Sequence, residues 1–313
     1  MLEIQGSVAL RQFTTLRAGG LAEQFVRVDS AEALAEAAAL AHLKNWTVTI
    51  LGGGSNMLPS DDGVPGLVIH NRARSIKVAR SGEVVADTGC AFQELFLKTA
   101  QAGLKGLEYA VGIPGSLGGA LVSNAGAYRS SVSEFITSLE VVENGQRKWV
   151  DPERMEFSYR DSVLRRANPP KLVVLKVAMK LPAGKPKEIY DEAREYQRQR
   201  ISKQPPPASA GSFFKNVLSI DLAQRIDGLS PGMRANGVVP AGFLVEAAGL
   251  KGFRMGGAMQ GLKHANFILN VGSATAFEIR RLAEHTKKTV LEKFDVMLEE
   301  EVLYLGDWSR FRA

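Results

Sequence analysis

The sequence contains a single cysteine, Cys90, so the chain cannot form an intramolecular disulfide, and the apolar surroundings of Cys90 indicate a structural role. Its four histidines follow no ligand spacing, so neither a zinc nor a heme site is expected. Long apolar runs are absent, and the N-terminus lacks a basic segment followed by an apolar core. We therefore expect a cytoplasmic protein without membrane insertion and without a metal.

Dense basic tracts are also lacking, although 39 Lys and Arg residues against 33 Asp and Glu give a formal charge of +6. The basic residues are spread along the chain and are not interleaved with aromatic residues, so a nucleic-acid partner is not expected. A positive field that serves an anionic small molecule is the more economical interpretation. With 313 residues, 45% of them hydrophobic, the chain can build two domains of ordinary size. We expect it to be a monomer.

Glycine is concentrated in the stretch GIPGSLGGALVSNAGAY, which runs from Gly112 to Tyr128. Glycine permits positive φ and removes Cβ, so a ligand can press against main-chain N–H groups. By itself the stretch fits a tightly packed turn as well as a binding loop.

A second glycine segment, Gly52-Gly53-Gly54-Ser55-Asn56, directly follows the predicted strand Trp46–Leu51. It is not a Walker loop, because no Lys-Ser or Lys-Thr follows at the required spacing. It is not a Rossmann loop either, because Met57–Gly63 reads as a loop and supplies no helix N-terminus. Anion binding would depend on backbone N–H groups and on the side chains of Ser55 and Asn56.

Local patterns predict several elements. Capping signals indicate helices from Ser30 to about Lys44 and from Thr275 to about Lys293, and a brief helical turn after Ser131. Asn144-Gly145 is a strong hairpin signal. The remaining predictions are helices at Ala91–Ala102 and Ile189–Lys203, and strands at Gln24–Val28, Leu67–Asn71, Ser75–Arg80, Glu83–Thr88, Ser138–Glu143, Gln146–Val150, Leu172–Leu181 and Val302–Leu305. Pro182–Pro186 reads as a linker between domains.

Motifs along almost the whole chain carry a resemblance to a known family. They are Thr14–Gly20, Leu51–Asn56, Gly112–Ala120, Asn124–Tyr128, Tyr159–Ser162, Gly211–Asn216, Ala241–Glu246, His264–Phe267 and Leu298–Val302. Singly these motifs are weak, but in this order they resemble the UDP-N-acetylenolpyruvoylglucosamine reductase (MurB) family. The short segment between Arg160 and Arg200 resembles the subtype that lacks an extra tyrosine loop, so Tyr190 is not assigned the role of that loop's tyrosine.

The resemblance implies an α+β architecture. An FAD-binding domain of the vanillyl-alcohol-oxidase type would span residues 1–182 as two small α+β subdomains with a boundary near 65–72. An α/β substrate-binding domain would span residues 187–313, with its C-terminal segment closing on the active site. FAD would bind non-covalently, with its pyrophosphate on the backbone around Gly53–Asn56 and Gly115–Ser116. The cofactor-binding residues would be Gly52, Gly53, Gly54, Ser55, Asn56, Gly112, Ile113, Gly115, Ser116, Gly119 and Ala120.

The family reaction would use NADPH to reduce the flavin, which passes hydride from N5 to the enolpyruvyl carbon of a UDP-sugar and forms UDP-N-acetylmuramate. Negative charge then develops on the adjacent carbon and spreads into the carboxylate, so it must be stabilised and that carbon protonated. Arg160 suits the first task because it can bind a carboxylate in bidentate fashion. Ser212 suits the second. Glu301 would hydrogen-bond to the enol or carboxylate, and strand alternation places it on the face opposite Glu300.

Substrate contacts are expected from the second half of the chain and from the end of the glycine stretch. Arg200 and Lys203, one helical turn apart, would meet the UDP diphosphate, and Tyr128 would lie near the flavin or sugar. The other predicted substrate-binding residues are Lys215, Asn216 and His264. Arg129 and Val217 depart from the family pattern, which has glycine and proline at these positions.

Each assignment has an ordinary structural alternative: a surface ion pair for Arg160, a turn for Ser212 and a solvated acid for Glu301. At the level of function, the alternatives are another FAD-dependent oxidase or dehydrogenase of the same fold, and a non-catalytic flavin-binding protein. The absence of a His or Cys flavin-linkage motif in the glycine loops argues against the oxidase.

Overall fold

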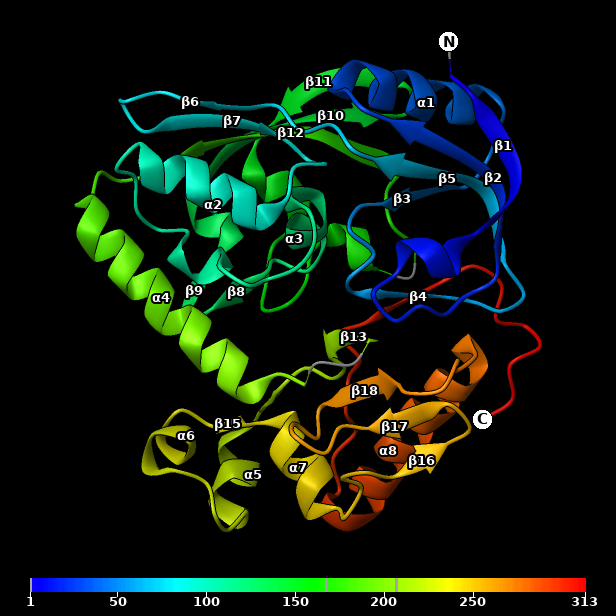
Figure 1. The fold of residues 1–313 in the computed structure, drawn as a ribbon, viewed down its shortest axis with the longest axis vertical. Helices are drawn as coiled ribbons and strands as arrows, with labels where there is room; N and C mark the ends of the chain where they lie inside the picture. The colour runs from blue at the N-terminus through cyan, green and yellow to red at the C-terminus, as the bar shows by residue number, and fades with distance from the viewer. Residues whose placement is uncertain (1, 167, 206–207) are drawn as a thin grey trace. The chain divides into compact units, whose positions relative to one another are not determined.

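The computed structural model describes residues 2–166, 168–205 and 208–313. The chain divides into two compact units, each assembled from segments that are far apart in the sequence (Figure 1). The first unit consists of Met1–Ala9, Leu21–Gly54 and Val64–Ser202, and the second of Leu10–Gly20, Ser55–Gly63 and Lys203–Ala313. Two short N-terminal segments therefore belong with the C-terminal third of the chain.

The first unit begins with a four-stranded sheet in the order β1-β2-β5-β3. Its strands are β1 (Ile4–Ala9), β2 (Leu21–Val28), β3 (Val48–Leu51) and β5 (Val64–Asn71), and only the β1–β2 pair is antiparallel among these described strands. Helix α1 (Ala31–Leu43) packs its alanine-rich face on this sheet. The Ser30 hydroxyl accepts a hydrogen bond from the Ala33 N–H at 3.1 Å, which confirms the predicted cap.

A second, antiparallel sheet in the same unit has the order β11-β10-β12-β7-β6. It contains β6 (Ile76–Val78), β7 (Glu83–Asp87), β10 (Ile136–Glu143), β11 (Gln146–Val150) and β12 (Leu172–Lys180). Strand β12 is apolar because both of its faces are covered. Val173 and Leu175 pack in the hydrophobic cluster that includes the buried residues of α1. Val174 and Val177 pack in the hydrophobic cluster on the other face of the sheet.

Three helices cover that other face, α2 (Phe92–Gln101), α3 (Leu117–Val122) and α4 (Pro186–Lys203) (Figure 1). The predicted apolar face of α2, including Phe92 and Phe96, is buried. Ile189 and Ala193 attach α4 to the same core. The helix therefore belongs to the first unit although it leads directly into the second.

The second unit is built around a four-stranded antiparallel sheet, β13 (Ala208–Ser212), β18 (Phe267–Asn270), β17 (Ala258–Gln260) and β16 (Arg254–Met255), in that order. Helices α7 (Ala241–Ala247) and α8 (Ala276–Phe294) pack in its core. The Thr275 and Glu278 capping box that was predicted for α8 is present. The smaller elements are β14 (Val217–Leu218), α5 (Ile220–Arg225), α6 (Pro231–Ala235) and β15 (Val238–Val239).

Two expectations need correction or adjustment. Met57–Gly63 was expected to be a loop, but β4 (Met57–Pro59) pairs in parallel with β19 (Leu303–Leu305), a partner at the other end of the sequence. The expected linker Pro182–Pro186 instead lies within the first unit, where the Gly184 N–H donates to the Gly103 carbonyl at 2.8 Å. Here the prolines and the glycine mark the break between β12 and α4. The chain passes from the first unit to the second after Ser202.

The other local predictions agree with the structure within a few residues. The Asn144-Gly145 turn joins β10 to β11 with positive φ at both residues, and Ser131 caps a short helical turn through a complete capping box with Glu134. In the part of the chain that is described, no helix is both long and apolar enough to cross a membrane.

Candidate functional site

Two glycine segments of the first unit pack directly against each other. A Cβ atom on Gly53 would lie 2.7 Å from the Cα of Gly115, and one on Gly52 would overlap the Ser116 hydroxyl. The sequence predicted that these glycines let the backbone approach something closely. The structure shows that each segment approaches the other, so glycine is required here by main-chain packing.

The first turn of α3 fixes several of the predicted cofactor-binding residues. The Ser116 hydroxyl accepts a hydrogen bond from the Gly119 N–H at 3.2 Å, and the Ser116 carbonyl accepts one from the Ala120 N–H at 3.0 Å. The Ile113 N–H donates to the Ala110 carbonyl at 3.0 Å. These N–H groups are engaged inside the protein, whereas the hydroxyl hydrogen of Ser116 can still be donated to a ligand.

Arg160 stands in a tight turn that Ser158 and Asp161 close through reciprocal backbone hydrogen bonds of 3.1 and 3.3 Å. Its φ is +54°, a conformation that is rare outside glycine. The guanidinium donates to the carbonyl of Gly126 in the glycine stretch and lies 5.3 Å from the centre of the Tyr159 ring. The turn thus presents Arg160 to the same stretch that the sequence predicted to bind the cofactor.

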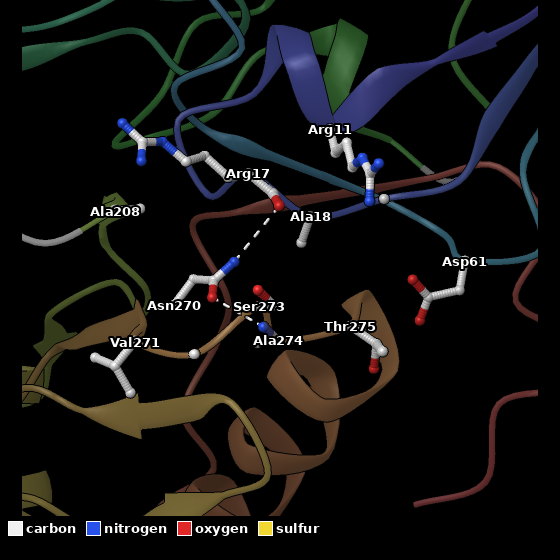
Figure 2. Close-up of a pocket in the computed structure, with 12 residues that line it drawn as sticks. Arg11, Arg17, Ala18, Asp61, Ala208, Asn270, Val271, Ser273, Ala274 and Thr275 are labelled. Atoms are coloured by element: carbon white, nitrogen blue, oxygen red, sulfur yellow. Dashed lines mark hydrogen bonds between the residues drawn. The ribbon is translucent and has the colours of Figure 1, made fainter.

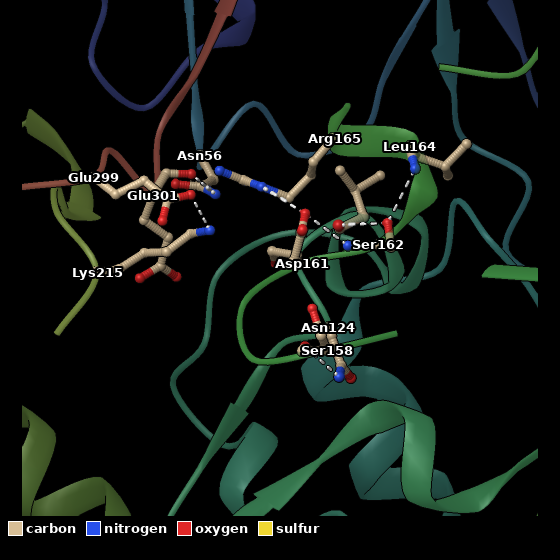
Figure 3. Close-up of polar contacts among 12 residues, drawn as sticks. Asn56, Asn124, Ser158, Asp161, Ser162, Leu164, Arg165, Lys215, Glu299 and Glu301 are labelled. Atoms are coloured by element: carbon tan, nitrogen blue, oxygen red, sulfur yellow. Dashed lines mark hydrogen bonds and ion pairs between the residues drawn. The ribbon is translucent and has the colours of Figure 1, made fainter. Parts of the chain in front are cut away.

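A buried asparagine holds this turn in place. The Asn124 carboxamide donates to the Ser158 carbonyl at 2.9 Å (Figure 3). It also accepts from the Ser133 N–H at 3.3 Å. Asn124 was not among the predicted site residues. Its signal was available in the sequence, because it begins the NAGAY motif and an internal asparagine can satisfy both a donor and an acceptor.

Helix α4 contacts both ends of the glycine stretch through Tyr196 and Arg200, which lie one turn apart. The Tyr128 ring stacks on the Tyr196 ring with centroids 3.7 Å apart and an interplanar angle of 9°. The Arg200 guanidinium donates to the Tyr109 carbonyl at 3.1 Å, and the Arg200 side chain passes close to Gly112. Sequence reasoning identified Tyr128 and Arg200 but not Tyr196, which lies one turn before Arg200 on α4 and stacks on Tyr128.

Arg200 is partly buried, and its buried Nε has no hydrogen-bond partner among the described residues. Burial is the main cause that lowers the pKa of the Arg200 guanidinium, and the positive charge of Arg160 lowers it further. Two guanidinium groups therefore lie within electrostatic reach of each other. A bound anion would compensate for the lost hydration of Arg200 and reduce the repulsion between the two guanidinium groups.

In the second unit, Ser212 and Glu301 are brought together by neighbouring strands. Ser212 ends β13 opposite Phe267 of β18. The next residue, Phe213, accepts a hydrogen bond at its carbonyl from the Glu301 N–H at 2.8 Å, and the Lys215 N–H donates to the Glu299 carbonyl at 2.8 Å. Residues 213–215 and 299–301 therefore run side by side, and Glu301 is paired with Phe213, the residue that follows Ser212.

The run Glu299–Glu301 is divided among different neighbours. Glu299 pairs with Lys215 at 2.5 Å, and Glu300 pairs with Lys287 of α8 at 2.6 Å. Burial alone would lower the pKa of Lys287, but the hydrogen bonds that Lys287 donates to Glu300 and Glu284 raise it above the usual value. Glu300 thus serves the packing of α8, which accords with its expected orientation away from Glu301.

Asn56 holds the main chain of the segment that carries Glu301, within the second unit. The Asn56 carboxamide donates to the Glu301 carbonyl at 3.1 Å (Figure 3). The main-chain carbonyl of Asn56 accepts from the Leu303 N–H at 3.1 Å. Both Ser55 and Asn56 belong to the second unit, whereas Gly52–Gly54 belong to the first. A predicted cofactor-binding residue therefore also fixes the main chain at Glu301.

The predicted substrate-binding residues of the second unit are held in different ways. The side chain of Lys215 is 10% exposed and is paired with Glu299, as described above. Asn216 accepts a hydrogen bond from the Ala241 N–H at 3.2 Å, at the start of α7. The next residue, Val217, pairs with Val239, so valine occupies a short strand at the position where the family has proline.

His264 is about half buried, and its Nδ1 accepts a hydrogen bond from the Asn266 N–H at 3.2 Å. Burial lowers the pKa of His264, and the positive charge of Lys203 lowers it further. Lys203 itself is exposed. The neutral ring that results carries its proton on Nε2, so His264 offers a hydrogen-bond donor to a ligand.

A cavity of about 730 Å³ in the second unit lies beside the Thr14–Gly20 motif (Figure 2). Arg11 and Arg17 line it together with the loop that precedes α8. Asp61, also in its lining, accepts hydrogen bonds from the N–H groups of Ala276 and Phe277 at 3.0 and 2.8 Å. None of the residues named here was assigned a functional role from the sequence. Asp61 is engaged in capping α8.

The first unit's residues fit a phosphate-bearing cofactor by their chemistry. Main chain without side chains at Gly53 and Gly115 permits close approach of a phosphate, and the Ser116 hydroxyl can donate a hydrogen bond to it. Among the residues described, no group of three or more His, Cys, Asp or Glu side chains could hold a metal ion.

Comparisons with known proteins agree over nearly the whole chain. Residues 22–150 match the family described as FAD binding domain, and residues 201–305 match the family described as UDP-N-acetylenolpyruvoylglucosamine reductase, C-terminal domain. The UDP-N-acetylenolpyruvoylglucosamine reductase of Synechococcus sp. (strain JA-3-3Ab) is 36% identical over 98% of this chain and 92% of its own length. The UDP-N-acetylenolpyruvoylglucosamine reductase of Rubrobacter xylanophilus is 37% identical over 95% of this chain and 94% of its own length.

A solved structure gives the same result. The structure of UDP-N-acetylenolpyruvylglucosamine reductase (MurB) from Thermus caldophilus is 32% identical to this chain and superimposes with a TM-score of 0.77. The match covers 97% of this chain and 100% of that one. The similarity therefore extends across both units and not only the cofactor-binding part.

Proposed function

The chain belongs to the UDP-N-acetylenolpyruvoylglucosamine reductase family, and we propose that it catalyses the family reaction with Arg160, Ser212 and Glu301 as catalytic residues. It is an FAD-containing, NADPH-dependent oxidoreductase that reduces the enolpyruvyl group of UDP-N-acetylglucosamine enolpyruvate to UDP-N-acetylmuramate, a step of peptidoglycan precursor synthesis. The predicted α+β architecture with a vanillyl-alcohol-oxidase-type FAD-binding fold is confirmed. The subtype without the tyrosine loop, the monomeric state and the cytoplasmic location stay predictions.

FAD, when bound, supplies hydride-transfer chemistry between NADPH and the substrate. The two glycine segments, with Ser116 and Asn56, would hold its phosphates through main-chain N–H groups and side-chain donors. The close packing of Gly53 on Gly115 supports this proposal, because it fixes two loops of the proposed site in one arrangement. Rigid donors do not have to be reorganised when the cofactor binds.

Ser212 would donate its proton to the carbon beside the reduced methylene carbon, and the serine oxygen would then recover a proton from solvent. A carbanion next to a carboxylate is basic enough to accept a proton from a hydroxyl group. Glu301 would hydrogen-bond to the enol or carboxylate. The observation that best supports these roles is the backbone hydrogen bond from Glu301 to Phe213, which makes Glu301 and the residue after Ser212 direct neighbours.

Arg160 would stabilise the negative charge that develops on the substrate carboxylate. Its turn is held by Asn124, and its charge lies within reach of Arg200 in the same unit. We propose that Arg200 and Lys203 bind the diphosphate, with Tyr128, Lys215, Asn216 and His264 as further substrate contacts. The buried and unpartnered Nε of Arg200 and the donor on His264 support this assignment among the described residues.

Activity can be tested with the purified protein. We expect flavin absorbance from the protein, and NADPH consumption that depends on the enolpyruvyl UDP-sugar equally in air and without oxygen. NADPH consumption in air that is independent of the sugar would indicate an oxidase. Colourless protein that releases no flavin and gains no activity with added FAD would contradict any flavin-dependent function.

A further inference from the structure

Asn266 is a buried asparagine immediately before β18, with 3% of its surface exposed. Its carboxamide donates to the Phe214 carbonyl at 2.8 Å and accepts from the Phe214 N–H at 3.0 Å. Its own carbonyl accepts from the Phe213 N–H at 2.7 Å. The pairing of β13 with β18 ends at Ser212, and Asn266 continues the hydrogen bonding along the next two residues.

The opposite edge of the same segment is paired as well. The Phe213 carbonyl accepts from the Glu301 N–H, and Phe214 forms a bridge with Glu300. The main chain that follows Ser212 is therefore held between Asn266 on one side and the strand that carries Glu301 on the other. Displacement of Phe214 would move Ser212 and Glu301 relative to each other.

A carboxamide suits this position because it combines a donor and an acceptor. Phe214 is only 1% exposed, so its N–H and carbonyl cannot be hydrated if the asparagine is removed. Each of these buried main-chain groups would then lose its hydrogen bond without gaining one to water, which destabilises the segment. An aspartate of the same shape could accept from the N–H but could not donate to the carbonyl while it is ionised.

We propose that Asn266 is a positioning residue for the reduction: it fixes the main chain at Phe213 and Phe214 so that Ser212 keeps its place beside Glu301. This role rests on the proposed function of Ser212 as proton donor. Asn266 acts through the backbone of its neighbours. Its N–H also holds Nδ1 of His264, so the same residue sets the donor that His264 presents.

The test compares Asn266→Asp and Asn266→Ala with Asn270→Ala and Ser212→Ala, all as FAD-loaded proteins. Asn270 is a matched control on β18, because its carboxamide also donates to a main-chain carbonyl, that of Leu16 at 2.8 Å, and accepts from the Ala274 N–H at 2.9 Å. Stopped-flow measurements follow flavin reduction by NADPH and flavin reoxidation by the enolpyruvyl UDP-sugar separately. Flavin content is measured for each variant.

We expect both Asn266 variants to slow reoxidation by about 10-fold or more while flavin reduction changes by less than about 3-fold, since small displacements of a reacting group cost this much. Asn270→Ala should change neither half-reaction by more than about 3-fold. A general loss of structure would reduce flavin content and both half-reactions together. The nearly isosteric aspartate keeps the test valid if the alanine variant does not fold.

Normal reoxidation in both Asn266 variants, with slow reoxidation in Ser212→Ala, would overturn the positioning role alone. Equal slowing of both half-reactions in the Asn266 variants would also overturn it. Normal reoxidation in Ser212→Ala would overturn the proposed role of Ser212 and, with it, the positioning role of Asn266.

Discussion

Gly53 and Gly115 meet main chain to main chain, and a Cβ atom on Gly53 would lie 2.7 Å from the Cα of Gly115. Gly53→Ala should therefore push the two glycine segments apart. We expect it to lower the free energy of unfolding by about 1–3 kcal/mol, as overpacking does. We also expect at least about a 10-fold increase in the dissociation constant for FAD, equal to about 1.4 kcal/mol.

Gly6→Ala is the matched control for that prediction, because a Cβ on Gly6 would lie 3.8 Å from the Glu23 carbonyl oxygen, at ordinary van der Waals distance. FAD binding is measured by flavin absorbance and titration, and stability by urea unfolding of the FAD-free proteins. Unchanged stability and FAD affinity in Gly53→Ala would contradict the packing argument.

Arg129 adopts φ +70°, directly after Tyr128 at φ +54°. Side chains with a Cβ are disfavoured in this left-handed region, and the sequence departs here from the family pattern of glycine. Arg129→Gly should raise the free energy of unfolding by about 0.5–1 kcal/mol, because relief of strain exceeds the added entropy of the unfolded chain. Arg129→Ala, which keeps a Cβ, should not reproduce the gain in a urea-unfolding comparison.

His70 of β5 provides a pH-dependent prediction. Burial, with added repulsion from Arg72 and Arg27, lowers its pKa to about 4. In the unfolded chain the imidazole titrates near pH 6.5, so unfolding takes up a proton between these values. The stability that comes from keeping this ring neutral is fully present above pH ~6.5 and is lost as the pH falls toward ~4.

His70→Gln should therefore flatten the decline in the free energy of unfolding over that pH range, by roughly 1–2 kcal/mol after allowance for the partial exposure of the ring. Urea unfolding at several pH values gives the measurement, and His42→Gln at an exposed position is the control. A decline as steep as that of the wild type in His70→Gln would rule out this assignment.

The elements predicted best are those specified by neighbouring residues. Thr275 with Glu278 and Ser131 with Glu134 cap their own helical turns, and Asn144-Gly145 closes its own hairpin, so the sequence contains the whole interaction. β4 was missed because its partner, Leu303–Leu305, is at the other end of the sequence. Its three residues have no periodicity that could indicate a strand without that partner.

The site shows the same division between local and distant information. Glycine at position 53 indicated close approach of the backbone, but the sequence could not identify Gly115 as what it approaches. The residues that hold the proposed site, such as Asn124 and Asn266, act through main-chain groups of distant segments. Family resemblance identified their motifs, and only the structure revealed what their side chains bind.

The most direct test of the account is a stopped-flow comparison of the two half-reactions in Ser212→Ala. If Ser212 donates the proton, flavin reduction by NADPH should stay near the wild-type rate, while reoxidation by the enolpyruvyl UDP-sugar should slow by about 100-fold or more. Reoxidation at the wild-type rate, or equal slowing of both half-reactions, would contradict Ser212 as the proton donor.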